Sequence, residues 1–172
     1  SGQIGGALSF DGVDDYVKVG TINMSVQYGS LSVWINARAF STDKQTIFGH
    51  TTQPIYANRI QIYVDDPGGN LDLGFGSSYP IASAVYTLVP GQWYNVFLTW
   101  NAGTYTVFVN GAVTATGPYA GFSTLNPYAH VGAEGYDGLA NFRSWDGTLD
   151  DARLYNRVLS AQEVQAFYDS TK

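Results

Sequence analysis

Two groups of aspartates, one near each end of the 172-residue sequence, carry the chemistry that stands out first. The N-terminal group is Asp11, Asp14 and Asp15, and the C-terminal group is Asp150 and Asp151. Calcium takes about six to eight oxygen ligands from carboxylates, backbone carbonyls and water. We therefore expect the two groups to meet, with one calcium ion between them, and to tie the ends of the chain together.

The expected ligands are the carboxylates of Asp11, Asp14 and Asp150 and the carbonyl oxygen of Gly12. A second interpretation needs no metal. In that case Asp11 and Asp14 accept N–H bonds within their own turn. Asp150 then accepts donors from the N-terminal loop.

Strand periodicity gives the expected position of Asp150. Read as a strand, residues 147–155 alternate so that Asp150 shares a face with Ala152 and Leu154. The apolar side chains predict that this face points to the core. A carboxylate there must be paired, hydrogen-bonded or bound to a metal.

The remaining ionisable residues do not form a recognisable catalytic group. Glycoside hydrolysis needs two carboxyl groups about 5–10 Å apart. Neither glutamate, Glu134 or Glu163, has a carboxylate at alternate spacing on a strand. His50 and His130 are far apart in the sequence and are expected to be structural. We therefore expect that the protein is not an enzyme.

Three stretches that are expected to be loops combine aromatic and polar side chains in a way that suits a sugar, namely residues 50–59, 77–80 and 134–141. Sugars present apolar ring faces and hydroxyl edges, so their sites pair an aromatic surface with polar groups. The expected ligand contacts are Tyr56, Asn58, Arg59, Tyr136 and Asp137. The alternative is that these tyrosines pack over the edge of a sheet.

Composition excludes several classes of partner. Only 13% of the residues are charged and the net charge is −6, with no cluster of basic residues, so neither nucleic acid nor an anionic membrane surface is expected as a partner. The sequence has no cysteine, which excludes disulfides and thiolate metal sites. No apolar run approaches the roughly 20 residues of a membrane span, so no membrane insertion is expected.

The elements that must position these residues are mostly strands. Alternating or β-branched runs predict strands at residues 31–36, 45–49, 59–64, 71–75, 92–100 and 105–109. Turn residues at 65–70 and at Asn110-Gly111 predict hairpins, and residues 133–147 read as a long loop. Only the end of the chain reads as helix, where Ser160 and Glu163 form a capping box.

These elements predict an all-β fold in one domain, residues 1–172. About ten to twelve strands with a single short C-terminal helix are typical of a two-sheet antiparallel jelly-roll β-sandwich. The opening residues 1–3 are expected to be the start of a domain excised from a longer chain.

Five stretches, in the same order along the chain, resemble the laminin-G-like jelly roll of the concanavalin A-like lectin/glucanase superfamily. They are residues 5–17, 31–35, 93–100, 105–111 and 147–160. The resemblance implies a structural calcium ion at the aspartates described above. It also implies a bacterial secreted or surface protein, often attached to polysaccharide-active enzymes. Members of this family often begin with a further strand, and this sequence departs from that pattern.

The function that we expect is a non-catalytic carbohydrate-binding, lectin-like module of a secreted or cell-surface protein. Its partner would be a polysaccharide or glycan, and it would be one module of a larger chain. The alternative is a structural or adhesion domain that binds a protein or acts as a spacer. A glucanase is the weakest reading, because the sequence offers no pair of convergent carboxylates.

Overall fold

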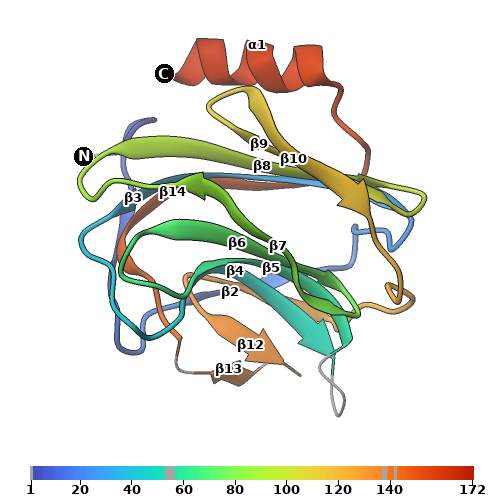
Figure 1. Ribbon diagram of the computed structural model, residues 1–172, viewed down its shortest axis with the longest axis horizontal. Coiled ribbons are helices and arrows are strands. Elements are labelled where there is room, and N and C mark those ends of the chain that lie inside the picture. Colours follow the sequence, from blue (N-terminus) through green and yellow to red (C-terminus); the bar gives the residue numbers. More distant parts are fainter. Residues whose placement is uncertain (1, 53–56, 137–138, 142) are drawn as a thin grey trace.

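The computed structural model describes residues 2–52, 57–136, 139–141 and 143–172, and the side chains of residues 136 and 139–141 lie outside this description. Two antiparallel sheets of six strands each face one another across a hydrophobic core (Figure 1). The predicted jelly-roll β-sandwich is therefore confirmed. Within the described part of the chain, no helix has the length and apolar character needed to cross a membrane.

The sheet covered by the C-terminal helix, called here the helix-side sheet, has the strand order β1-β14-β3-β8-β9-β10. In that order its strands span Leu8–Asp11, Asp146–Tyr155, Tyr28–Ala37, Trp93–Asn101, Thr104–Val109 and Ala112–Pro118. The opposite sheet, called the hairpin-side sheet, has the order β2-β11-β4-β5-β6-β7. In that order its strands span Val17–Gly20, Tyr128–Val131, Gln45–Thr52, Ala57–Val64, Asn70–Gly76 and Ser78–Thr87.

A third, two-stranded sheet covers part of the hairpin-side sheet. It consists of β12 (Glu134–Tyr136) and β13 (Leu139–Asn141), and we call it the covering hairpin. It lies on the outer side of the sandwich, away from the helix (Figure 1). Residues 133–147 had been predicted as a loop, so the covering hairpin corrects that prediction. Three-residue strands are too short to show a periodic pattern in the sequence.

The core lies between the two sheets. Alternate residues of each strand point inward, such as Ile35 and Val96 on the helix-side sheet and Ile60, Ile62 and Phe75 on the hairpin-side sheet. All five side chains are buried. The β-branched and aromatic residues that predicted strands in the sequence are thus the residues that fill the sandwich.

Two predicted hairpins are confirmed. β5 and β6 pair with Val64 opposite Leu71, so the intervening turn joins them directly. β9 and β10 are joined by Asn110-Gly111, whose φ angles are 52° and 81°. Two successive left-handed residues form a type I′ turn, which Asn-Gly favours because neither residue is strained there.

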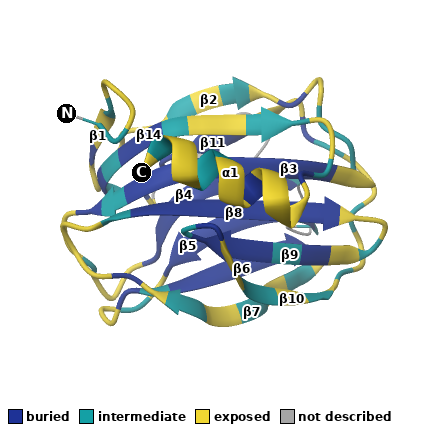
Figure 2. Cartoon of the chain, turned by 90° about the horizontal axis from the view of Figure 1, so that it is seen from above, coloured by how far each residue is buried: buried dark blue, intermediate teal, exposed yellow. Residues whose placement is uncertain are grey.

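The C-terminal helix α1 (Ala161–Thr171) begins with the predicted capping box. Ser160 Oγ accepts the N–H of Glu163, and a Glu163 carboxylate oxygen accepts the N–H of Ser160. The helix lies across the outer face of the helix-side sheet (Figure 2). There Val164 is fully buried in a small cluster that includes Phe97 and Phe108.

The two ends of the chain are joined by backbone pairing. β1 pairs with β14, with Leu8 opposite Leu149 and Asp11 opposite Asp146. The expectation that the terminal strands are neighbours is therefore confirmed. The two strands run antiparallel, so the start of β1 lies beside the middle of β14.

A β-bulge in β14 changes which of its side chains face the core. The register against β3 shifts between Asp150 and Arg153, and Asp151 in this segment has a φ of 47°. Aspartate tolerates this left-handed conformation better than most residues do. An extra residue in a strand reverses the in-out alternation. Leu149 and Leu154 therefore both pack against the core.

The prediction that Asp150 faces the core together with Ala152 and Leu154 is wrong. Asp150 follows the core residue Leu149, so its side chain points to the outer face of the helix-side sheet. There its Oδ2 accepts the N–H of Ile4 at 2.7 Å, whereas Ala152 is exposed. The N-terminal segment therefore supplies a donor to this buried carboxylate, as in the metal-free interpretation.

We expect that replacing Val164 with alanine lowers the free energy of unfolding by about 2 kcal/mol. The change removes two buried methyl groups and leaves a cavity between α1 and the sheet. Chemical unfolding followed by circular dichroism measures this loss. The control is Gln162→Ala on the exposed face of the same helix, which should shift the free energy by less than about 0.5 kcal/mol. Equal effects of the two changes would show that the helix is not packed as described.

Candidate functional site

The turn between β1 and β2 brings three carboxylates together. One oxygen of each of Asp11, Asp14 and Asp15 lies within 4.8 Å of the others. Asp11 Oδ1 accepts the N–H of Val13 at 2.8 Å, and Asp15 Oδ2 accepts the N–H of Asp11 at 3.0 Å. These bonds fix the turn. Clustered carboxylate oxygens are the ligand type that a hard cation such as calcium prefers.

This acidic turn differs from the predicted ligand set. Asp11 and Asp14 are together and Gly12 lies between them, but Asp15 joins them in place of Asp150. The register shows why, because Asp11 is paired with Asp146 and Asp150 lies further along β14. The sequence indicated that the two ends of the chain meet, but the register by which they meet was not readable from it.

A polar cleft of about 550 Å³ lies between the acidic turn and the start of β4. Its lining residues are Gly12, Val13, Ser41, Thr42, Asp43, Lys44, Gln45, Arg143 and Ser144. Ser144 Oγ donates to the carbonyl of Val13 at 3.1 Å and so joins two walls of the cleft. Hydroxyl, amide and charged groups around one hollow are suited to bind a ligand that has many hydrogen-bonding groups.

Glu134 on the covering hairpin fixes the two cations that line the polar cleft. Its Oε2 lies 3.3 Å from Lys44 Nζ and 2.8 Å from Arg143 Nη1. Its Oε1 accepts from Gln61 Nε2 at 2.9 Å. Glu134, Lys44 and Gln61 are all buried, whereas the Arg143 side chain is about half exposed. We call these four residues the Glu134 cluster.

The charges of the cluster stabilise one another. Burial alone would raise the pKa of Glu134, but Lys44 and Arg143 outweigh it and hold that pKa below its usual value. Burial lowers the pKa of Lys44 to about 8, although the neighbouring Glu134 opposes that shift. At neutral pH the carboxyl is therefore ionised, and Lys44 is close enough to its pKa to respond to a rise in pH.

Two glycines allow the covering hairpin to lie close against the sheet. A Cβ at Gly49 on β4 would overlap the carbonyl of Ala133. A Cβ at Gly135 would overlap the ring of His130 on β11. Without side chains at these two positions the backbones approach closely. Glu134 is thereby held over the face of the hairpin-side sheet.

Asn58 has a structural role, unlike the ligand contact that we predicted. Its side chain is buried; Nδ2 donates to Thr52 Oγ1 and Thr124 Oγ1, and Oδ1 accepts the N–H groups of Ser123 and Thr124. Its φ of 53° is left-handed, which asparagine tolerates. Because these bonds occupy the whole amide group, Asn58 holds the loop after β10 and has no amide donor or acceptor left for a ligand.

Of the four other residues that we predicted as ligand contacts, the structure describes the side chain of one. Arg59 lies on the outer face of the hairpin-side sheet, with its guanidinium carbon 5.3 Å from the centre of the Tyr79 ring. Tyr56 and Asp137 lie outside the described residues. Tyr136 belongs to β12, but its side chain is outside the description. Tyr79, which was predicted in a loop, lies on the edge strand β7, where a following proline is tolerated.

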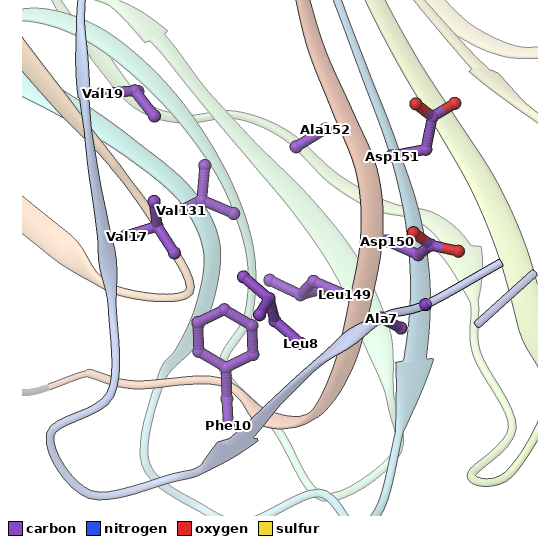
Figure 3. A pocket seen from close by; sticks show the side chains of 11 residues that line it. Ala7, Leu8, Phe10, Val17, Val19, Val131, Leu149, Asp150, Asp151 and Ala152 are labelled. Carbon is purple, nitrogen blue, oxygen red and sulfur yellow. The ribbon is translucent and has the colours of Figure 1, made fainter. Parts of the chain in front are cut away.

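A second cleft, of about 270 Å³, is apolar and opens at the edge of the sandwich (Figure 3). Phe10 and Leu149 on one side face Val17 and Val131 on the other. Leu8 at its mouth is 57% exposed. We call it the edge cleft; its lining is mostly apolar, with Asp150 and Asp151 as its charged residues.

Sequence reasoning missed the Glu134 cluster as a unit. Glu134 was noted as a lone carboxylate, and neither Lys44 nor Arg143 was singled out. Lys44 and Glu134 are 90 residues apart, and no spacing rule connects them. The nearest signal was that Glu134 and Arg143 flank a glycine-rich segment, as the two ends of a hairpin do.

Comparison with protein families gives a match over most of the chain. The family described as the concanavalin A-like lectin/glucanases superfamily matches residues 11–165. A search of curated proteins found no significant match.

Solved structures share the fold at low sequence identity. One of them is domain 4 of AbnA, a GH43 extracellular arabinanase from Geobacillus stearothermophilus, which was solved in complex with arabinotriose. Its sequence is 23% identical and its TM-score is 0.72, and the match covers 99% of this chain and 79% of that domain's chain. A SAP-like pentraxin from Limulus polyphemus is 23% identical with a TM-score of 0.67, over 93% and 80% of the two chains. Trypanosoma rangeli sialidase is 16% identical with a TM-score of 0.67, but the match covers 83% of this chain and only 22% of the sialidase.

His50 connects β4 to the loop after β10 and is buried in its neutral form. Its Nδ1 lies 2.8 Å from the carbonyl of Asn58, to which it must donate, and its Nε2 accepts the N–H of Asn126 at 2.9 Å. Burial lowers the pKa of His50, and burial together with Lys18 lowers the pKa of His130. Protonation of Nε2 would break the bond from Asn126.

We expect the free energy of unfolding to fall as the pH drops below about 6.5. The unfolded chain binds protons on both histidines near the ordinary pKa of 6.5, whereas the folded chain binds them only at lower pH. Urea unfolding at pH 7.5 and pH 5.0 measures the difference in the free energy of unfolding. Both pH values lie above the ordinary pKa of glutamate, so the histidines are the side chains whose protonation changes most. His50→Gln should be less stable at pH 7.5 but should show a smaller loss between the two values. Equal stability at both pH values would contradict the assignment.

We expect Glu134→Gln to lower the free energy of unfolding at pH 7 by about 2–4 kcal/mol, because it leaves the buried Lys44 ammonium without its carboxylate. The deficit should shrink towards pH 9–10, where Lys44 with its pKa of about 8 is already neutral in the parent protein. Urea unfolding across this pH range measures both effects. Asp43→Asn, which removes an exposed carboxylate from the same cleft, is the control and should change stability little. A deficit that is independent of pH would show that the ion pair is not its cause.

Proposed function

Because the chain belongs to the concanavalin A-like lectin/glucanase superfamily, we propose that it is a carbohydrate-binding module without catalytic activity. The glycan occupies the polar cleft beside the acidic turn. The observation that carries this proposal is a cleft of about 550 Å³ lined in part by Lys44 and Arg143. The buried carboxylate of Glu134 forms ion pairs with both cations and so holds them in place.

The lining of the polar cleft has the chemistry that sugar hydroxyls need. Ser41 and Thr42 are exposed and offer hydroxyl groups that donate and accept, and the exposed Asp43 accepts. Arg143 and Lys44 are oriented by Glu134, so less side-chain freedom is lost when a ligand binds. Hydrogen bonds to oriented groups favour specificity with modest affinity.

One chemical parallel is the arabinanase domain, which was solved in complex with arabinotriose. The fold is shared over nearly the whole of this chain, and by analogy we assign a short oligosaccharide to it as well. The sialidase similarity concerns only a fifth of that enzyme, and so its activity is not assigned to this chain.

The carboxyl groups near the cleft argue against hydrolysis. A general acid for glycoside cleavage needs a raised pKa so that it is protonated at neutral pH. The pKa of Glu134 is instead lowered by Lys44 and Arg143. Burial raises the pKa of Asp72, but this residue is outside the cleft lining and its Oδ1 accepts the N–H of Ala84.

We also propose that the acidic turn binds calcium. Asp11, Asp14 and Asp15 supply clustered carboxylate oxygens, and the carbonyl of Gly12 is the further ligand expected from the sequence. Gly12 and Val13 line the polar cleft, so an ion in this turn would stiffen one wall of the glycan site. Bound calcium supplies structural rigidity here and takes no part in a reaction.

The setting that suits this function is a secreted or cell-surface protein of a bacterium, in which the domain is one module of a larger chain. Binding to a glycan would then raise the local concentration of a tethered partner at that surface. A second candidate function is an adhesion or spacer domain. Two observations favour this function, namely the apolar edge cleft and the exposed apolar side chains of Leu8, Val13 and Ile22. Leu8 lines the cleft, and Val13 and Ile22 are close in sequence to other residues that line it.

The test is a glycan array probed with calcium-loaded and chelated protein. We expect binding to one class of oligosaccharide, weakened after chelation, and a melting temperature that rises by about 5–10 °C at a hundredfold excess of calcium over its Kd. Asp14→Asn should remove the thermal shift, whereas Asp169→Asn on the exposed helix should retain it.

The two proposals fail separately. Absence of binding across the array by folded protein would overturn the glycan proposal and favour the adhesion domain. A melting temperature that does not respond to calcium would overturn the metal proposal alone.

A further inference from the structure

Tyr79 is an exposed aromatic residue whose ring lies against the outer face of the hairpin-side sheet. It projects from the edge strand β7 over Gly74 on β6, where a Cβ would come within 3.0 Å of Tyr79 Cδ2. The missing side chain at Gly74 lets the ring approach the backbone. The Tyr79 ring is therefore held close to the sheet.

Three neighbouring side chains hold the ring of Tyr79 in place. Tyr63 stacks with it, with ring centres 5.1 Å apart and an angle of 21° between the planes. Lys44 Nζ lies 4.5 Å and the Arg59 guanidinium carbon 5.3 Å from the ring centre. Cation–π contacts and stacking orient the ring before any ligand arrives.

The ring nevertheless retains a large accessible surface. Tyr79 is 40% exposed, whereas its stacking partner Tyr63 is fully buried. An oriented aromatic ring that stays accessible loses little conformational freedom when a ligand packs on it. An apolar sugar face needs such a surface.

Lys44 connects this ring to the polar cleft. The same ammonium group lies 3.3 Å from Glu134, lines the cleft, and lies 4.1 Å from the centre of the Tyr63 ring. The cleft and the ring therefore share one buried side chain. One short chain of sugars can contact both.

Charges of both signs surround the ring. The cations that act on this group are Lys44, Arg59 and Arg143, and the carboxyl groups are Glu134, Asp65 and Asp72, with Asp66 beside Asp72. Burial raises the pKa of both tyrosines, so their hydroxyls stay neutral. A surface on which charges of both signs are mixed favours an uncharged ligand.

We infer that Tyr79, flanked by Arg59, is a stacking subsite for one ring of a neutral oligosaccharide whose other end occupies the polar cleft. This inference rests on the proposed function. The subsite favours a ligand of more than one sugar, with one ring on Tyr79 and another in the polar cleft.

The experiment titrates wild-type protein and variants with arabinotriose, xylotriose, cellotriose and mannotriose and with the matching monosaccharides, alongside the glycan array. Tyr79→Ala and Tyr79→Leu should each weaken trisaccharide binding about three- to tenfold and leave monosaccharide binding unchanged. Tyr79→Phe should stay within about twofold of wild type, because it keeps the ring. The matched control is Tyr28→Ala, since Tyr28 is similarly exposed on the other sheet.

A second measurement follows the wild-type protein and needs only the conservative Tyr79→Phe variant, for assignment. The ring resonances of Tyr79, assigned by comparison with Tyr79→Phe, should shift when a trisaccharide is added and should not shift with the monosaccharide. This result decides the question even where a variant folds poorly.

The possible results distinguish a failure of the proposed function from a failure of the Tyr79 subsite. If wild-type protein binds none of the sugars or arrayed glycans, the proposed function and the subsite are both wrong. If it binds while Tyr79→Ala matches wild type and the ring resonances stay fixed, the subsite alone is wrong. Binding confined to acidic glycans would overturn the neutral ligand class.

Discussion

Glu134 is a buried carboxylate, and a buried charge must be paired with groups of opposite charge or with hydrogen-bond donors. The arrangement of the outer face of the hairpin-side sheet depends on the groups that pair with Glu134. Its oxygens hold Lys44, Arg143 and Gln61, which come from three separate parts of the chain. Removing any one partner would leave an uncompensated polar group in a poorly solvated place. The covering hairpin, the wall of the polar cleft and the position of Lys44 beside the two tyrosines all follow from this one constraint.

The fold was largely predictable because local rules and tertiary packing agree along most of the chain. Alternation, turn chemistry at Asn110-Gly111 and the capping box at Ser160 each indicated the element that forms. The failures lie where a local rule is interrupted. Alternation through Asp151 gave the wrong face for Asp150, because a bulge reverses the pattern and only a left-handed φ marks it. β7 was missed because it is an edge strand with little apolar alternation.

The candidate site was predictable only in part. The aspartates of the acidic turn are close in sequence, so their clustering could be read directly. The Glu134 cluster could not, because its members are brought together by the hairpin and by the order of the strands. Asn58 illustrates the opposite error. A polar residue beside an aromatic one resembles a sugar contact, but the side chain is consumed by bonds to a loop some 65 residues away.

The pairing of β1 with β14 has a mechanical consequence. The start of β1 and the continuation of β14 towards the C-terminus leave the ladder at the same end, because the strands are antiparallel and Leu8 is opposite Leu149. Tension applied between the two termini would first load the contacts that join the terminal segments, the Gln3–Thr171 and Ile4–Asp150 hydrogen bonds, and would then open the β1–β14 ladder from its Leu8–Leu149 end. A domain of this design would yield first at the edge where its ends meet, because β4 and the Glu134 cluster lie on the other side of the sandwich, away from this ladder.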